Sequence, residues 1–148
     1  MVSLRALAPS LTRITIAAAV GAALHIGKGD TEIVDQTALD FSRTVLNQTE
    51  IDGEVICCEG PKDNAPAFSR REKVGRGVSP KVEFIIDPVD GTTNAVRGIP
   101  FMATAIAVSR APYLKDVEAA LVSDLFHNVT YTAQRDQGAH RNEERIKP

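Results

Sequence analysis

Residues 83–93 read EFIIDPVDGTT and bring two aspartates and two threonines together around a proline and a glycine. The apolar residues before Asp87 predict a buried strand, and the proline and glycine are ordinary turn residues. A turn alone does not need two carboxylates, and Asp87 and Asp90 repel each other unless a cation lies between them. Carboxylate oxygens, together with the Val89 carbonyl, are donors that Mg²⁺, Mn²⁺ and Ca²⁺ prefer. The segment therefore predicts either a metal-binding strand end or a solvated turn.

The residues after Asp90 add a second kind of chemistry. Gly91, Thr92 and Thr93 resemble a helix start, where free backbone N–H groups and the helix dipole favour a phosphate. A metal beside a phosphate indicates phosphoryl transfer to water. Two upstream acids would join this site if strands 54–58 and 82–86 are neighbours: Glu59 at a strand end and Asp35 on a helix. Without that contact, Asp35 is a favourable helix-start charge and Glu59 an ordinary loop carboxylate.

The remaining pattern predicts helices first and strands afterwards. That order is typical of an α+β fold, with helices packed on a largely antiparallel sheet. A long surface loop without clean periodicity is expected over residues 60–80. The expected helices span residues 3–27, with a break near Pro9, and 31–48, capped by Asp30 or Thr31, with Ile33, Ala38, Phe41, Val45 and Leu46 on the apolar side. The expected strands are 54–58, 82–86, 101–108, 117–122 and 128–134, followed by one short final strand.

Composition indicates a soluble globular chain of 148 residues, which is the size of one domain. The net charge of −2 gives no reason to expect a nucleic-acid partner. The only cysteines, Cys57 and Cys58, are expected to be buried free thiols of a reducing, cytoplasmic compartment. The apolar run 14–26 is too short to cross a membrane, so it is either a buried helix or the core of a signal peptide.

The motif DPVDGTTN resembles the metal-binding motif of the inositol monophosphatase superfamily. The segments NAVRGIPFMATAIAVS and VSDLFHNVTYTAQRDQGAHRNEERI resemble the helix start, strand and hairpin that follow it there. Upstream, the residues from GKGDTEIVDQTALDF to EKVG are similar to class II fructose-1,6-bisphosphatase, a branch of that superfamily. The resemblance runs from Gly27 to the C-terminus. It favours a first helix over a signal peptide, and it implies the N-terminal half of a layered αβαβα sugar-phosphatase fold.

The resemblance implies a role for each candidate residue. It implies a Mg²⁺-dependent phosphomonoesterase, with Mn²⁺ as a possible substitute, that acts on a small sugar or inositol phosphate without a nucleic-acid or membrane partner. The implied metal ligands are Glu59, Asp87, the Val89 carbonyl and Asp90; Asp35 and Thr92 would orient and deprotonate the attacking water; Gly91, Thr92 and Thr93 would bind the substrate phosphate.

Two departures from the family pattern shape a second hypothesis. The family usually has Gly-Glu-Glu or Gly-Glu-Gly-Glu at the upstream strand end, where this chain reads Cys58-Glu59-Gly60-Pro61 and lacks one acid. The family also has a second half with a Trp-Asp-x-Ala type motif, so residues 1–148 are expected to form a single, incomplete domain. The alternative function is therefore a truncated, catalytically impaired metal-binding fragment that forms homo-oligomers or needs the missing half. The sequence leaves the sugar phosphate and the number of metals open.

Overall fold

The computed structural model describes residues 7–58 and 67–147. Within these residues, eight strands form one sheet in the order β2-β1-β3-β4-β5-β6-β7-β8. The strands are β1 (Asp52–Cys58), β2 (Lys73–Val74), β3 (Lys81–Asp90), β4 (Ala103–Ser109), β5 (Val117–Asp124), β6 (Val129–Gln134), β7 (Gly138–Arg141) and β8 (Glu144–Ile146). Only the pairing of β1 with β3 is parallel, and every other pairing in the described sheet is antiparallel.

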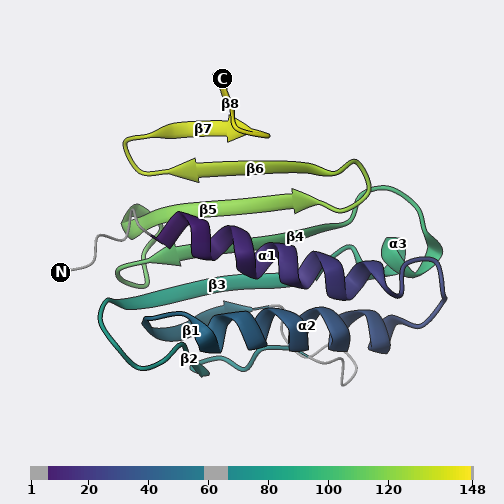
Figure 1. Cartoon of the computed structure of the whole chain (residues 1–148), viewed down its shortest axis with the longest axis horizontal. Helices are drawn as coiled ribbons and strands as arrows, with labels where there is room; N and C mark the ends of the chain where they lie inside the picture. Colours follow the sequence, from purple (N-terminus) through teal and green to yellow (C-terminus); the bar gives the residue numbers. More distant parts are fainter. Residues whose placement is uncertain (1–6, 59–66, 148) are drawn as a thin grey trace.

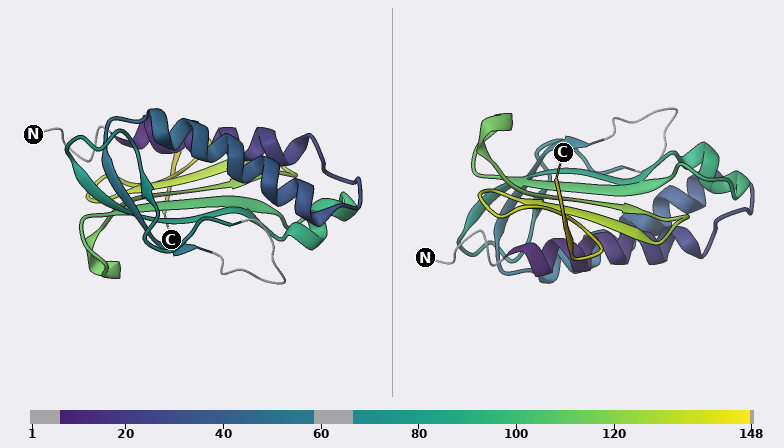
Figure 2. Two further views of the ribbon diagram at one scale, coloured as in Figure 1. Left: turned by 90° about the horizontal axis from the view of Figure 1, so that it is seen from below. Right: turned by 90° about the horizontal axis from the view of Figure 1, so that it is seen from above.

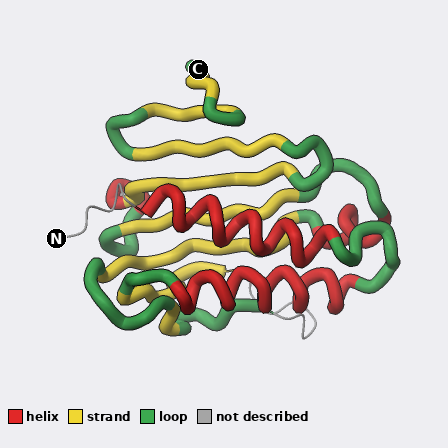
Figure 3. Tube along the Cα trace, in the orientation of Figure 1, coloured by secondary structure: helices red, strands yellow, loops and turns green. Residues whose placement is uncertain are grey.

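Two helices, α1 (Ala8–Ala23) and α2 (Thr31–Gln48), lie side by side on one face of this sheet (Figure 1). Seen edge-on, both helices lie on the same side, and the β4–β5 connection with its 3-10 turn Leu114–Asp116 projects from the opposite side (Figure 2). The tube view shows the same division between the helices and the strands behind them (Figure 3). The α+β prediction, with helices on a largely antiparallel sheet, is therefore confirmed. We call the helix-free side of the sheet the open face.

Helix α2 has the predicted bounds because Asp30 caps it, accepting a hydrogen bond from the Ile33 N–H at 3.1 Å. The predicted apolar side was partly wrong: Ile33 and Phe41 are 41% and 40% exposed. The buried residues of α2 recur with the helical period, and they lie on a face that is shifted by one residue from the predicted face. They are Val34, Ala38, Leu39, Ser42 and Leu46.

Helix α1 is not broken at Pro9 as predicted. Pro9 lies in the first turn, where a helix needs no backbone donor, so the proline starts the helix instead of breaking it. The helix ends at Ala23, before the predicted residue 27. Gly21 lets α1 approach α2 closely, because a Cβ there would lie 2.6 Å from the Thr37 carbonyl oxygen. In the part of the chain that the structure describes, no helix combines the length and the apolar character that a bilayer crossing requires.

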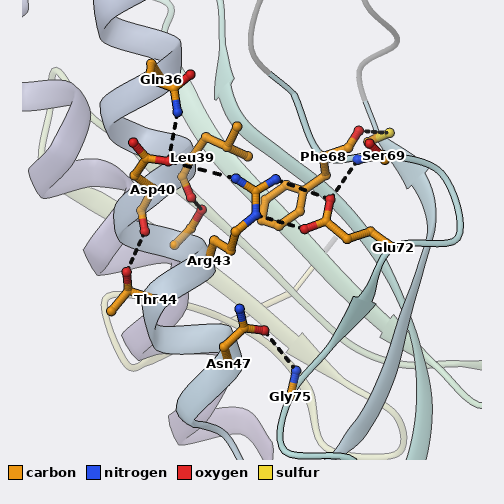
Figure 4. A network of polar contacts seen from close by, with 12 residues as sticks. Gln36, Leu39, Asp40, Arg43, Thr44, Asn47, Phe68, Ser69, Glu72 and Gly75 are labelled. Atoms are coloured by element: carbon orange, nitrogen blue, oxygen red, sulfur yellow. Dashed lines mark hydrogen bonds and ion pairs between the residues drawn. The ribbon is translucent and has the colours of Figure 1, made fainter.

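The predicted surface loop over residues 60–80 is described only from residue 67 onward, and this part is anchored to the fold. It contains β2, and Phe68 and Val74 are buried in the main core. Arg43 of α2 lies over the Phe68 ring and forms two hydrogen bonds with Glu72 (Figure 4). The expectation of a surface loop holds for most of these residues, which lie outside any strand and are exposed, but not for Phe68 and Val74, which are buried beside the edge of β1.

Several strand bounds also differ from the prediction. The strand predicted over residues 101–108 was expected to start at Phe101, but that residue has a φ of 68°, is 83% exposed and precedes β4. The expected single final strand is a hairpin of β7 and β8, which turns at Asn142 and Glu143 with positive φ at both. The cysteines are free thiols as predicted, but neither is fully buried: Cys57 is exposed and Cys58 is half-buried.

Candidate active site

The aspartate motif does not leave the sheet as a simple turn. It forms a bulge inside β3, because Asp87 pairs with Ala105 and Asp90 with Ala103. Two residues of β3 therefore oppose one residue of β4 between these pairs, and the first of them is Pro88, which tolerates a bulge. A local hydrogen bond stabilises the bulge: the Asp87 carboxylate accepts from the Val89 N–H at 3.2 Å. Asp87 is half-buried and Asp90 is exposed at this strand end.

Gly91 ends β3 and starts the short helix α3 (Thr92–Arg97). It has a φ of 82°, and a Cβ added there would lie 2.5 Å from the Phe101 carbonyl oxygen. Only glycine meets both demands without strain. The chain thus reverses immediately after Asp90, and Thr92 is the first residue of the helix.

Asp35 and Thr92 meet although they are 57 residues apart in sequence. The Thr92 hydroxyl donates to the Asp35 carboxylate at 2.9 Å and lies 3.1 Å from the Val89 carbonyl oxygen, its second acceptor. The predicted approach of these two side chains is therefore confirmed as a contact. Their chemical role stays a prediction.

A second core cluster holds this contact in place. Val34 and Ala38 of α2 pack with Val89 of β3 and with Ala95 and Val96 of α3. The turn between α1 and α2 also binds α3, because the Gly27 and Gly29 N–H groups donate to the Ala95 and Val96 carbonyls at 2.9 and 3.0 Å. The start of α2, the end of β3 and α3 therefore form one packed unit that fixes Asp35 against Thr92.

The predicted neighbours β1 and β3 lie side by side, with Cys58 paired to Ile86. Their carboxyl ends share the sheet edge that carries Asp87, as the sequence argument required. Glu59 itself lies outside the described residues, so its assignment as a metal ligand stays a prediction. Cys58, at the end of β1, donates its S–H to the Phe68 carbonyl at 2.9 Å, and burial raises the pKa of its thiol.

The donors at this edge suit a hard cation in kind, since Asp87, Asp90 and the Val89 carbonyl all offer oxygen. They come from one bulge, however, and make only part of a coordination sphere. Among residues 7–58 and 67–147, no group of three or more histidine, cysteine or acidic side chains is close enough together to hold a metal ion. The donor set thus fits Mg²⁺ in type, and a complete site needs ligands from outside the described residues.

Sequence reasoning missed one acidic residue at this edge. Ala103 pairs with Asp90 on one side and with Asp124 on the other, so the three residues form one row across β3, β4 and β5. Asp124 looks like an isolated turn residue in the sequence. Only the alternation of β5 and its antiparallel register with β4 would have revealed its position.

Comparison with known proteins decides the family. The family model described as "Bacterial fructose-1,6-bisphosphatase, glpX-encoded" matches residues 5–131. The chain belongs to this family. It is 38% identical over 107 residues to the class 2 fructose-1,6-bisphosphatase of Haemophilus influenzae, a match that covers 72% of the chain and 31% of the relative. It is also 38% identical over 104 residues to fructose-1,6-bisphosphatase 1 class 2 of Escherichia coli K12, covering 70% and 30%.

Solved structures agree with the fold. The extragenic suppressor protein SuhB of Bartonella henselae superposes with a TM-score of 0.74 at 24% identity, covering 96% of this chain and 53% of the other. Inositol monophosphatase II of Staphylococcus aureus MSSA476 gives a TM-score of 0.68 at 21% identity, covering 97% and 51%. This chain thus spans about half of the length of these structures and about a third of the length of the curated relatives that it matches.

Proposed function

We propose that this chain carries the N-terminal, incomplete domain of a Mg²⁺-dependent phosphomonoesterase for a small phosphorylated sugar. The observation that carries the proposal is the hydrogen bond between Thr92 and Asp35, formed directly beside the bulge that holds Asp87 and Asp90. A carboxylate that orients a hydroxyl next to hard oxygen donors is an arrangement for activating water near a phosphate. The family to which the chain belongs supports the same reaction.

In this mechanism, Asp35 and Thr92 act on the attacking water. The Thr92 hydroxyl donates its proton toward Asp35, so a lone pair on its oxygen remains to accept a hydrogen bond from water. Asp35 is the acceptor for the proton that the water loses. When bound, Mg²⁺ would lower the pKa of that water and neutralise charge on the phosphoryl group. Asp87, Asp90 and the Val89 carbonyl would hold the cation, with Glu59 as a further ligand, and Mn²⁺ would substitute for Mg²⁺.

The start of α3 would bind the phosphate that is hydrolysed. The first N–H groups of a helix have no acceptor within the helix, and here they belong to the residues around Gly91, Thr92 and Thr93. Fructose 1,6-bisphosphate is the first substrate to test, because the class 2 relatives carry that name. Inositol phosphate is the second, because structurally similar proteins include inositol monophosphatases.

A second candidate function is a catalytically impaired metal-binding fragment of this family. Two observations favour it: the chain spans 31% of the Haemophilus influenzae relative, and the segment Cys58-Glu59-Gly60-Pro61 lacks one acid of the pattern that is usual in the family. Loss of one metal's stabilisation of the leaving oxygen would slow hydrolysis by about a thousandfold or more. Such a fragment would bind the cation without appreciable turnover, and would form homo-oligomers or require a second polypeptide.

The two functions separate in a phosphate-release assay. Purified chain is incubated with saturating Mg²⁺ and with fructose 1,6-bisphosphate or inositol 1-phosphate, beside the variant Asp90→Asn. Release that depends on Mg²⁺ and disappears in Asp90→Asn supports the phosphatase. Mg²⁺ binding without release supports the impaired fragment. Release that is equal in the chain and in Asp90→Asn would contradict both, because it would not arise at this site.

A further inference from the structure

Helix α1 lies on the outside of the molecule and is almost uncharged. Its sequence, APSLTRITIAAAVGAA, contains a single charged residue, Arg13. One side of the helix is buried, but three large apolar side chains on the other side are exposed: Ile16 at 53%, Val20 at 48% and Leu24, the residue that follows the helix, at 50%. Surface helices normally present polar residues to water, and a helix that is apolar on all sides is usually covered on all sides. The outer side of α1 is therefore a candidate contact surface.

Helix α2 extends this apolar surface. Ile33 and Phe41, which are 41% and 40% exposed, are eight positions apart with Thr37 midway between them. The two helices run side by side in opposite directions (Figure 1). Gly21 of α1 meets Thr37 of α2, since a Cβ on that glycine would lie 2.6 Å from the Thr37 carbonyl oxygen. The exposed residues of both helices therefore lie on either side of one crossing point.

This crossing sets the order of the exposed side chains along the two helices. Each residue advances a helix by about 1.5 Å, so Leu24 lies level with Ile33, and Ile16 lies level with Phe41. The exposed residues of each helix are spaced by four or eight positions, which is the spacing of a ridge that packs against another helix. Soluble proteins seldom expose an apolar surface of this kind unless a partner binds it. We call these five residues the helix patch: Ile16, Val20, Leu24, Ile33 and Phe41.

We propose that the helix patch binds the helix patch of a second copy of this chain, with α1 of each copy lying on α2 of the other. A twofold axis parallel to the helices produces this arrangement, and α1 of one copy is then antiparallel to α2 of the other. Ile16 of one copy faces Phe41 of the second, and Leu24 faces Ile33. The patch is therefore complementary to itself, which is the requirement for a twofold dimer.

Charges at the border of the patch favour the same arrangement. Arg13 lies about 12 Å from Gly21 along α1, and Asp40 lies about 5 Å from Thr37 along α2 toward the same end of the helix pair. An extended arginine side chain spans the remaining offset of about 7 Å. The Asp40 side chain is 56% exposed, so its carboxylate can accept hydrogen bonds from Arg13 of the second copy. The dimer would thus contain two symmetric ion pairs between Arg13 and Asp40.

The size of the helix patch predicts a weak, reversible dimer. The two helices contain 16 and 18 residues, so their shared outer face is about 25 Å long and about 20 Å wide. This face offers about 500 Å² on each copy, or about 1,000 Å² in the dimer, which is near the lower limit for a specific interface.

The open face is the other surface on which two copies could meet. Phe84 and Ile86 of β3 are buried in the core on the helix side, so the alternating residues Glu83 and Asp87 face the open side. Two open faces would therefore bring like charges toward each other, whereas two helix patches pair opposite charges. The charges favour the helix patch as the contact surface.

Sedimentation equilibrium across micromolar concentrations measures the dimer. The test uses the wild type, Val20→Lys in the centre of the helix patch, and the matched control Val122→Lys on the open face, where the valine is 40% exposed and its neighbour Leu121 is buried. Two further variants are Arg13→Glu and the double variant Arg13→Glu with Asp40→Arg. Thermal unfolding followed by circular dichroism establishes that each variant is folded. None of the substituted residues belongs to the candidate active site, so the outcome does not depend on the proposed function.

We expect a reversible equilibrium between monomer and dimer for the wild type and for Val122→Lys. Val20→Lys should raise the dissociation constant by at least about tenfold, because it buries an unpaired charge in the contact. Arg13→Glu should raise it by about three- to tenfold, and the exchange of charges in the double variant should restore most of the affinity. A monomeric wild type, a loss in Val122→Lys equal to that in Val20→Lys, or a double variant that binds no tighter than Arg13→Glu would overturn the inference.

Discussion

Replacing Arg43 with methionine should lower the free energy of unfolding by about 2 kcal/mol. Arg43 Nε and Nη2 lie 2.8 and 3.2 Å from the two oxygens of Glu72, and the guanidinium lies 5.0 Å from the centre of the Phe68 ring (Figure 4). The ion pair between Arg43 and Glu72 links α2 to the segment that leads into β2. Methionine keeps the apolar stem but removes the donors, so the loss reports on the polar contact.

The expected loss of stability follows from the solvent exposure of the two side chains and from the hydrogen bond that Glu72 keeps in the variant. A hydrogen bond to a charged group contributes about 1.5–3 kcal/mol, and this pair makes two. The Arg43 and Glu72 side chains are 31% and 21% exposed, so water reaches both, and the Ser69 N–H still donates to Glu72 at 2.9 Å. These two features bring the expected loss down to about 2 kcal/mol, below the range of about 3–6 kcal/mol for two such bonds without solvent screening. For a chain of this size it corresponds to a fall of about 5 °C in the unfolding midpoint.

Lowering the pH should remove most of this difference. Burial raises the pKa of Glu72, but hydrogen bonds from Arg43 and Ser69 and the Arg43 charge outweigh it and hold the pKa below its ordinary value of 4.5. A carboxylate with a depressed folded-state pKa stabilises the fold fully above that ordinary value. The stabilisation is lost as the pH falls through the lower, folded-state value. Wild type and Arg43→Met should therefore converge in stability once the pH has fallen below the folded-state pKa of Glu72.

Urea unfolding followed by circular dichroism measures both effects. The matched control is Arg76→Met, whose partner Glu50 is 3.7 Å away and 78% exposed, so its loss should be below about 0.5 kcal/mol. Equal losses for Arg43→Met and Arg76→Met at neutral pH would refute the argument from burial. A difference between wild type and Arg43→Met that stays constant as the pH falls would refute the role assigned to the Glu72 charge.

Two further substitutions test the site itself. Gly91→Ala should destabilise the chain by about 1–3 kcal/mol in thermal unfolding, because φ is 82° there and the new Cβ meets the Phe101 carbonyl oxygen; an unchanged midpoint would contradict this. Thr92→Val should lower phosphate release by about a hundredfold by removing the hydroxyl that contacts Asp35, and Thr92→Ser should keep most of it. Equal rates in the valine and serine variants would show that the hydroxyl takes no part.

The sequence predicted the parts of this fold that depend on local signals. The cap at Asp30 defines the start of α2, and apolar alternation located the strands on both sides of the motif. The contact between Asp35 and Thr92 was predicted through the family resemblance, since no local signal joins residues so far apart.

What could not be predicted depends on register and on packing between elements. The motif was expected to be a turn, but the pairing of Asp87 and Asp90 with β4 makes it a bulge. Phe41 was assigned to the buried side of α2, yet the rotation of a helix is fixed by its contacts with the sheet, so its true buried face could not be read from composition. The place of Asp124 beside Asp90 likewise appears only once β4 and β5 are in register.

Titration with Mn²⁺, followed by electron paramagnetic resonance, tests the central claim most directly, because it detects a cation at the bulge whether or not the chain hydrolyses a phosphate. The comparison is between the wild type, Asp87→Asn and the matched control Asp116→Asn, whose aspartate precedes β5 at the opposite edge of the sheet. We predict weak binding by the wild type and by Asp116→Asn, and an affinity about tenfold lower in Asp87→Asn, since the change removes a charged oxygen ligand from a hard-cation site. Identical titrations for the wild type and Asp87→Asn would contradict the assignment of this strand end as the metal-binding site.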